Sequence, residues 1–287
     1  MRPLQVVFSI PIVLVTAYLI SRYGLGSPFS DLGANGFLTE EQRKALEEAY
    51  GLSGDPLLGF INFTLSLPRG GPPSSIYSKP SLELVLGPFA LTVAIVAFAA
   101  TASVIVASVT FVANPKALKL LGSAAFVPEY FYAIAFLVTS WYFGWPNPTL
   151  NFSYDKFLAY FAIVCLSISS KLAHLIDEMA SELSSSQFVA FWKAVGLSDR
   201  AIRRVELKAM WKGLLAFLLT LSAESLERSV MVEYLINFPG IGYFLFTSVV
   251  EVDVGLAASS FALLSIAAYA LVQLASSVGD SRWSVWK

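Results

Sequence analysis

Residues 82–111, LELVLGPFALTVAIVAFAATASVIVASVTF, decide the fold class of this chain. Apart from Glu83 the stretch carries no charged side chain. A helix needs about 20 consecutive apolar residues to cross the hydrocarbon core of a bilayer, which is roughly 30 Å thick. The stretch is long enough and apolar enough for that task, so it predicts a membrane-spanning helix.

Five other apolar runs accompany it, at residues 4–20, 117–143, 157–170, 211–236 and 255–275. Only 14% of the residues in the chain are charged and 56% are hydrophobic, whereas a soluble domain carries about 25% charged residues. The pair Asn114-Pro115 predicts a tight turn between the second and third runs. Together these features predict an all-α integral membrane protein with about six transmembrane helices.

Charge and cysteine content exclude several other classes of protein. The formal net charge of −1 provides no basic surface for a nucleic acid, so no nucleic-acid partner is expected. The single cysteine, Cys165, can form neither a disulfide framework nor a cysteine metal site. His174, Asp177 and Glu178 share helical spacing, but one histidine with two acids indicates a solvated helix end rather than a metal site.

The predicted organisation has three parts. Residues 1–20 form a first transmembrane helix, and residues 21–80 form an extracellular loop or cap rich in Gly, Pro and Ser. Inside that loop, Thr39 followed by Gln42 has the pattern of a capping box and predicts the start of a short helix. Residues 81–287 form a five-helix core with a cytoplasmic loop at residues 171–210.

The distribution of basic residues predicts the orientation of the chain. Lys and Arg stay preferentially on the cytoplasmic side of a membrane, and here they gather after the second, fourth and sixth apolar runs if the N-terminus is inside. We therefore expect a multi-pass protein of the cell membrane with both termini in the cytoplasm. The two Asn-x-Ser/Thr acceptors, Asn62 and Asn151, then fall on the outer side.

The most informative part of the cytoplasmic loop is residues 184–213. Ser184 and Gln187 have capping-box spacing, and the helix that follows places four apolar side chains on one face: Phe188, Phe191, Trp192 and Val195. Gly196 is expected to end this helix and Ser198 to cap the next one. Such an aromatic face fits either a groove in a partner protein or the lipid interface.

Two motifs resemble the permease subunits of ABC importers of the dipeptide/oligopeptide type. Residues 187–198, QFVAFWKAVGLS, are similar to the cytoplasmic coupling element of that family, which ends in Ala-x-Gly-Leu-Ser. Residues 233–242, EYLINFPGIG, resemble its Glu-x-x-Phe-x-Trp-Pro-Gly-Leu-Gly signature, and Asp253 follows where the family commonly has an aspartate. The chain departs from the family at Gln187, where an acidic residue is common, and near Leu214, where a proline is missing.

The resemblance implies a type I ABC importer permease fold, with a second permease subunit, two ATPase subunits and an extracellular solute-binding protein. It implies peptides or oligosaccharides as transported solutes. The sequence has no Gly-x-x-x-x-Gly-Lys-Ser/Thr phosphate loop, so ATP and Mg would be bound by the partner ATPases, and the chain would have no cofactor or catalytic residue of its own. The residues implied to contact the ATPase are Phe188, Phe191, Trp192, Lys193, Ala194, Val195 and Gly196, and the signature turn comprises Glu233, Phe238, Pro239, Gly240 and Gly242.

Glu224 and Glu227 lie within the fifth apolar run and are candidates for the translocation pathway, because charges at membrane depth usually face a cavity or a partner. Glu224 and Arg228 are four residues apart, so an ion pair between them is favoured over contact with a solute. A channel or an ion-coupled transporter that works alone is the main alternative to the importer. A membrane scaffold without a pathway is a third, which the intramembrane glutamates make less attractive.

Overall fold

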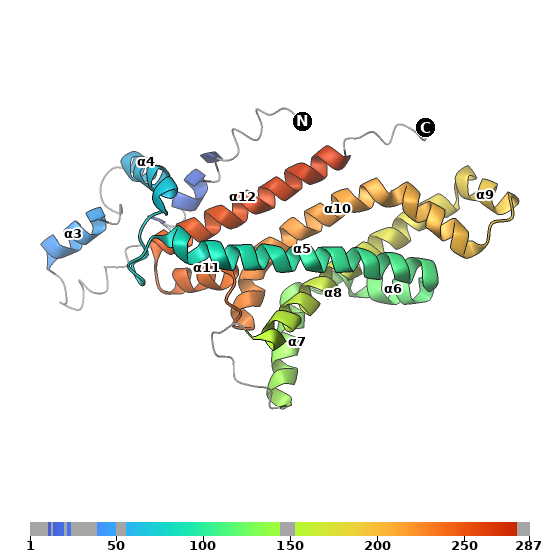
Figure 1. The fold of residues 1–287 in the computed structure, drawn as a ribbon, viewed down its shortest axis with the longest axis horizontal. Coiled ribbons are helices and arrows are strands. Elements are labelled where there is room, and N and C mark those ends of the chain that lie inside the picture. The colour runs from blue at the N-terminus through green and yellow to red at the C-terminus, as the bar shows by residue number, and fades with distance from the viewer. Residues whose placement is uncertain are drawn as a thin grey trace. The chain divides into compact units, whose positions relative to one another are not determined.

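The computed structural model describes residues 11–12, 14–19, 22–23, 39–49, 56–143 and 153–279. Within them the regular structure is helical, apart from an isolated bridge between Pro73 and Pro80 (Figure 1). The helices are α3 (Glu40–Ala49), α4 (Pro56–Ser66), α5 (Ser81–Ala113), α6 (Pro115–Ser123), α7 (Glu129–Tyr142), α8 (Tyr154–Ser184), α9 (Gln187–Ala194), α10 (Asp199–Leu235), α11 (Ile241–Val250) and α12 (Val254–Gly279), with the 3-10 helices η2 (Leu67–Arg69) and η3 (Ala124–Phe126).

The described residues contain four helices that are long and apolar enough to cross a membrane, namely α5, α8, α10 and α12. A fifth span is obtained if the bent pair Pro115–Phe126 and Glu129–Tyr142 is counted as one. These helices identify a multi-pass, all-helical membrane protein. The first predicted span, residues 4–20, lies partly outside the described residues. Its described residues, 11–12 and 14–19, are helical.

The third predicted span, residues 117–143, is not one straight helix. Its two halves meet at an angle of 96°. The cause is Pro128, which has no N–H to donate and which disfavours helical geometry in the residue before it. Val127 accordingly adopts φ −83° and ψ 119°, and α7 begins at Glu129. The predicted turn before this span is confirmed, since the Asn114 side chain accepts hydrogen bonds from the N–H groups of Lys116 and Ala117.

The fourth predicted span, residues 157–170, is too short, because α8 runs without a break for 31 residues. Helical residues such as Lys171 therefore belong to the span helix rather than to a separate polar segment. At about 1.5 Å per residue α8 is roughly 46 Å long, which exceeds the roughly 30 Å core of a bilayer. One end of α8 therefore extends beyond the membrane core.

The chain divides into two compact units. Unit 1 comprises Met1–Thr92 and Ser229–Ala267, and unit 2 comprises Val93–Arg228 and Ala268–Lys287. In unit 1, Tyr18, Phe63 and Ala258 form a buried apolar cluster. The capping box predicted at the start of α3 is confirmed, because Thr39 Oγ1 accepts from the Gln42 N–H and Gln42 Oε1 accepts from the Thr39 N–H.

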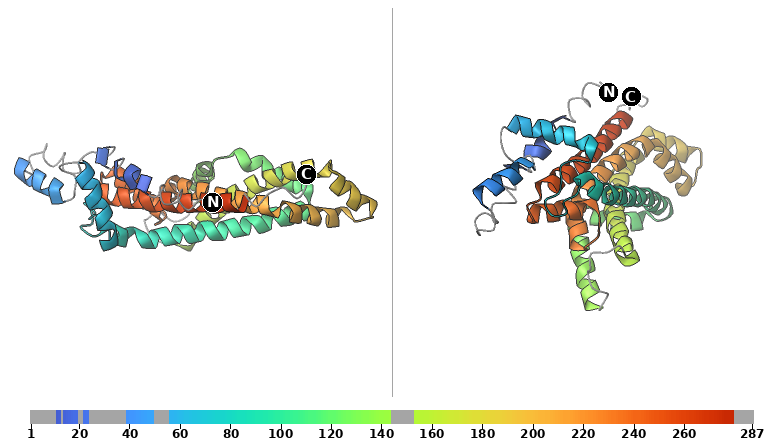
Figure 2. Two further views of the ribbon diagram at one scale, coloured as in Figure 1. Left: turned by 90° about the horizontal axis from the view of Figure 1, so that it is seen from above. Right: turned by 60° about the vertical axis from the view of Figure 1, so that its left-hand side comes forward.

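In unit 2, α6 packs closely on α8. A Cβ added to Gly122 would lie 3.2 Å from the backbone nitrogen of His174, so a larger residue there would require α6 and α8 to shift by a few tenths of an ångström. Ser103 of α5 donates to the carbonyl oxygen of Cys165 in α8 at 3.0 Å. The short helix α9 lies in the connection between α8 and α10, which can be followed from two further sides in Figure 2.

Candidate functional site

The short helix α9 begins later than its sequence pattern predicts. Ser184 is the last residue of α8, and its hydroxyl donates to the carbonyl of Ser181, so it does not form a capping box with Gln187. Ser186 instead occupies the cap position of α9, without a side-chain hydrogen bond to the helix. Residues 184–186 are all serines, so each of them could be the N-cap of α9. Because α8 continues to Ser184, the N-cap is the last serine, Ser186.

The end of α9 is a complete Schellman turn. Gly196 has a φ of +87°, and its N–H donates to the Lys193 carbonyl at 3.0 Å. The N–H of Leu197 donates to the Trp192 carbonyl at 3.2 Å, which completes the pair of hydrogen bonds that defines the motif. The expectation that Gly196 ends this helix is confirmed. Nothing lies within 4 Å of a Cβ built on Gly196, so its backbone conformation, and not crowding, requires glycine.

The aromatic side chains of α9 pack edge to face on one another. The Phe191 and Trp192 ring centroids are 5.2 Å apart, and those of Phe188 and Trp192 are 6.4 Å apart. Of the four residues predicted to share one face, Phe191 and Val195 are 60% and 56% exposed, whereas Phe188 and Trp192 are half-buried. Lys193 and Ala194 are exposed as well. We call the exposed pair Phe191 and Val195 the α9 apolar surface.

Three features that the sequence did not predict mark the region where α9 meets the start of α10. Val189 is 1% exposed and anchors α9. Arg203 Nε donates to the Val112 carbonyl at the end of α5 at 3.2 Å. Glu206 of α10 is buried, and the positive charges of Arg203 and of Lys193 on α9 lie near its carboxyl. Ser198 caps α10 as predicted, since its hydroxyl accepts from the Ala201 N–H.

In unit 1, residues 233–242 form a tight turn centred on the fully buried carboxylate of Glu233. Oε2 accepts from the N–H groups of Gly242 at 2.7 Å and Tyr243 at 3.3 Å, and Oε1 accepts from Thr92 Oγ1 at 2.6 Å. Thr92 Oγ1 also accepts from the Ile241 N–H at 3.2 Å. The first three N–H groups of α11, which have no partner within the helix, are thus all satisfied. The negative charge also complements the positive end of the helix dipole.

Steric contacts explain the two glycines of this turn. A Cβ on Gly240 would lie 2.3 Å from Cδ of Glu233, and a Cβ on Gly242 would lie 2.5 Å from Cα of Val230. Phe238 is fully buried, and its N–H donates to the Glu233 carbonyl, which closes α10. The predicted tight turn is confirmed, and its residues act together as one structural unit.

Asp253 links the start of α12 to the loop before α5, within unit 1. Its Oδ1 accepts from the Leu256 N–H at 3.0 Å, which is a helix N-cap. Its Oδ2 accepts from the Ser74 hydroxyl and from the Ile76 N–H. A Cβ on Gly255 would lie 2.4 Å from the Pro73 carbonyl oxygen, so this glycine lets the loop approach α12. Asp253 therefore has a structural role that the sequence alone did not assign.

Glu224 lies in a network of charges in unit 2. Its Oε1 pairs with Arg228, as the spacing predicted, and its Oε2 pairs with Lys171 Nζ of α8 at 3.1 Å. The structure therefore gives Glu224 two cations, where the sequence predicted one. Glu227, the second pathway candidate, is exposed.

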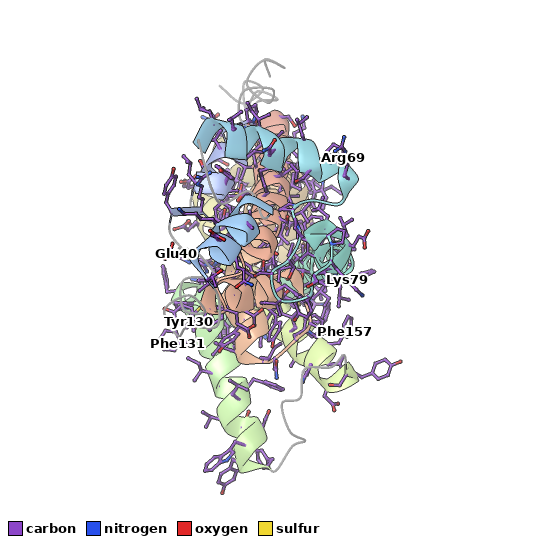
Figure 3. The ribbon with its side chains drawn as sticks, turned by 90° about the vertical axis from the view of Figure 1, so that its left-hand side faces the viewer. Glu40, Arg69, Lys79, Tyr130, Phe131 and Phe157 are labelled. Carbon is purple, nitrogen blue, oxygen red and sulfur yellow. The ribbon has the colours of Figure 1, made fainter. Side chains whose placement is uncertain are left out.

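The aromatic pair Tyr130 and Phe131 at the start of α7, labelled in Figure 3, is also exposed.

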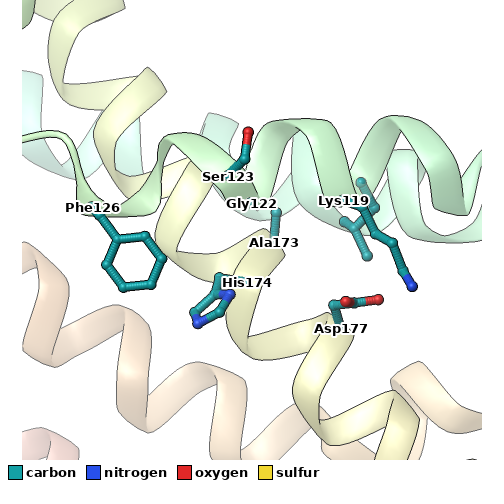
Figure 4. Close-up of a pocket in the computed structure, with 8 residues that line it drawn as sticks. Lys119, Gly122, Ser123, Phe126, Ala173, His174 and Asp177 are labelled. Carbon is teal, nitrogen blue, oxygen red and sulfur yellow. The ribbon is translucent and has the colours of Figure 1, made fainter.

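His174 belongs to a pocket between α6, η3 and α8 (Figure 4). Its ring packs edge to face on Phe126 at 5.2 Å, and its Nε2 lies 3.5 Å from Glu178 Oε1. The pocket lining is mixed: Leu118, Lys119, Gly122, Ser123, Phe126, Ala173, His174 and Asp177. Among the described residues, no three His, Cys, Asp or Glu side chains are grouped so that they could hold a metal ion.

Comparison with known proteins does not assign the chain to a family. No protein-family model matches it, and no curated protein matches it in sequence. What the site can do therefore follows from its residues. The α9 apolar surface offers apolar contact area, whereas the carboxylates of Glu233 and Asp253 are occupied by backbone groups and Glu224 by two cations.

Proposed function

We propose that this chain is the membrane-spanning permease subunit of an ATP-driven importer for peptides or oligosaccharides. The observation that carries the proposal is the α9 apolar surface, which stays exposed although the same short helix buries Val189. A side chain as large as Phe191 gains about 1.5–3 kcal/mol when it is fully buried, so a partner protein would gain by covering it. Residues 187–198 resemble the coupling element of ABC importer permeases, so we propose that this partner is a separate ATPase.

The local geometry suits a rigid lever. Between α9 and α10 there is only the Schellman turn at Gly196 and the Ser198 cap, and both are closed by hydrogen bonds. The hydrogen bond of Arg203 to Val112 ties the base of α10 to α5. A displacement of α9 by a closing ATPase would therefore move α10 without first unfolding the connection. The pore would open alternately inward and outward as a result.

The other subunits of the proposed importer follow from the resemblance. They are a second permease, two ATPases that bind ATP and Mg, and an extracellular solute-binding protein. In this assembly Glu233, Phe238, Pro239, Gly240 and Gly242 would maintain the turn from α10 into α11. We assign them a structural role, because the Glu233 carboxylate is fully buried and holds the N–H groups of α11.

Purification of the full chain from its own membranes in mild detergent tests the proposal. The wild-type chain should co-purify with a subunit that hydrolyses ATP, and Phe191→Ser should lose that subunit. Trp141→Ser is the matched control, because Trp141 is 85% exposed at the end of α7 and its removal also deletes exposed aromatic surface. If Phe191→Ser retains the ATPase as Trp141→Ser does, then α9 does not form the contact with the ATPase.

An ion-coupled transporter that works alone is the second candidate, and the network of Glu224, Lys171 and Arg228 favours it. Charged groups on apolar helices mark ion pathways in many transporters. The purified chain, reconstituted by itself in liposomes, separates the two candidates. Solute uptake driven by an ion gradient, without an ATPase, would support the second candidate and contradict the first.

A further inference from the structure

Glu129 is a buried acid to which the proposed importer function assigns no role. It is the first residue of α7, directly after the bend at Pro128, and it is only 1% exposed. The Ser167 hydroxyl of α8 donates to its Oε1 at 2.9 Å, and the Ser225 hydroxyl of α10 donates to the same oxygen at 2.8 Å. Its Oε2 is buried as well and has no hydrogen-bond partner among the described residues.

The charged and titratable groups around Glu129 come from each helix packed against it in unit 2. They are Tyr132 on α7, Lys171 on α8, and Glu224 with Arg228 on α10. Lys171 and Arg228 both attract the Glu129 carboxyl, but each already pairs with Glu224. The two positive charges thus have a closer negative partner, and Glu129 forms no ion pair of its own among the described residues.

An ionised carboxylate is poorly accommodated in such a place. A buried charge without a paired partner is much more costly than a buried neutral group, and the bare Oε2 would carry half of that charge. In the neutral acid, a proton on Oε1 can be donated to one serine while the other serine still donates to Oε1, because hydroxyl groups both donate and accept. Oε2 is then a carbonyl oxygen, which tolerates the lack of a partner better than a charged oxygen does.

We propose that Glu129 is a proton-binding site of the α7–α8–α10 bundle. A proton adds no heavy atom, so the enclosed carboxyl can hold it while the helices stay packed. When α10 moves away from α7, water reaches the carboxyl and the proton is released. Proton binding and packing of the bundle are therefore linked, whichever solute the protein transports and whether or not an ATPase drives it.

The linkage predicts the sign of a pH effect. The packed bundle binds one proton more than the opened bundle does, so rising pH favours opening over the window in which the two states differ. In that window the ratio of packed to opened protein should fall by up to about tenfold per pH unit, the limit for one proton. Glu129→Gln, which has the shape of the neutral acid but cannot titrate, should abolish this contribution.

Infrared spectroscopy of the purified full chain in detergent tests the proposal directly. At neutral pH the wild-type chain should show the carbonyl band of a protonated carboxylic acid, and Glu129→Gln should lose that band. Glu227→Gln is the matched control, because it removes an exposed carboxyl of α10 and leaves Lys171 and Arg228 paired with Glu224, so the band should be unchanged. A band of equal intensity in wild type and Glu129→Gln would overturn the proposal.

The pH dependence of unfolding provides the second measurement. Wild type should become less stable relative to Glu129→Gln as pH rises above the ordinary range of a glutamate, and Glu227→Gln should follow wild type. A constant difference between wild type and Glu129→Gln across this range would contradict the linkage. Because glutamine mimics the neutral acid, failure of Glu129→Gln to fold would also contradict the proposal.

Discussion

Gly240 should be replaceable only when the carboxylate of Glu233 is removed with it. A Cβ on Gly240 would lie 2.3 Å from Cδ and from Oε2 of Glu233, far inside the contact distance of about 3.5–4.0 Å. Gly240 itself has φ −95° and ψ 176°, which any residue can adopt. The cost of Gly240→Ala should therefore arise from displacement of the carboxylate and not from the backbone.

The magnitude follows from the hydrogen bonds that a displaced carboxylate would lose. Oε2 accepts from Gly242 at 2.7 Å and from Tyr243 at 3.3 Å, and hydrogen bonds to a charged group contribute about 1.5–3 kcal/mol each. Because the second bond is long, we expect Gly240→Ala to lower the free energy of unfolding by about 3 kcal/mol. In a Glu233→Ala background the same change should cost about 1 kcal/mol or less, the ordinary effect of alanine at a helix N-cap.

The assay is a double-mutant cycle on the purified chain, unfolded reversibly in mixed micelles. Gly196→Ala is the control: nothing crowds its Cβ, so its cost should be the same with and without Glu233. We predict a coupling of about 2 kcal/mol between Gly240 and Glu233. If Gly240→Ala costs the same in both backgrounds, the turn is not built around this carboxylate.

Three further changes test other parts of the structure. Gly196→Val should abolish solute uptake by the reconstituted importer while ATP hydrolysis continues, whereas Gly196→Asn should be nearly normal because asparagine tolerates positive φ. Glu224→Gln leaves Lys171 and Arg228 without their shared partner and should lower the free energy of unfolding by about 1–2 kcal/mol. Solute uptake per folded molecule should not change. A loss of uptake would instead assign Glu224 to the solute pathway. Asp253→Ala removes the N-cap of α12 and the hydrogen bonds of Asp253 to the 74–76 loop. Thermal unfolding should show that the free energy of unfolding falls by about 2 kcal/mol. An unchanged free energy of unfolding would refute this structural role.

The apolar runs predicted most of the span helices because bilayer thickness sets a length that is visible in the sequence. The apolar runs gave wrong boundaries where polar residues continue a helix and where an apolar stretch is bent. The helix α8 continues past Lys171 because its polar residues are compatible with a helix and Glu224 supplies a charge for the lysine. The 96° bend before α7 could not be read from the length of the apolar run, because the run continues across Pro128, which marks the bend.

The local features of the candidate site were the most predictable. Gly196 and Ser198 end and begin helices by rules that involve only neighbouring residues, and both predictions are confirmed. The roles of Glu129 and Glu206 could not be found in this way. Each depends on groups that folding brings near from other helices, such as Ser167 and Ser225 for Glu129. A carboxylate in an apolar run was the available signal for Glu129, and it was visible in the sequence.

The central claim is that the α9 apolar surface contacts a separate ATPase. Its most direct test is a photo-crosslinking side chain at position 191, activated in intact membranes, with the same side chain at position 141 as the control. The account predicts a crosslink from position 191 to an ATP-hydrolysing subunit and none from position 141. Crosslinks from position 191 to lipid alone would contradict it.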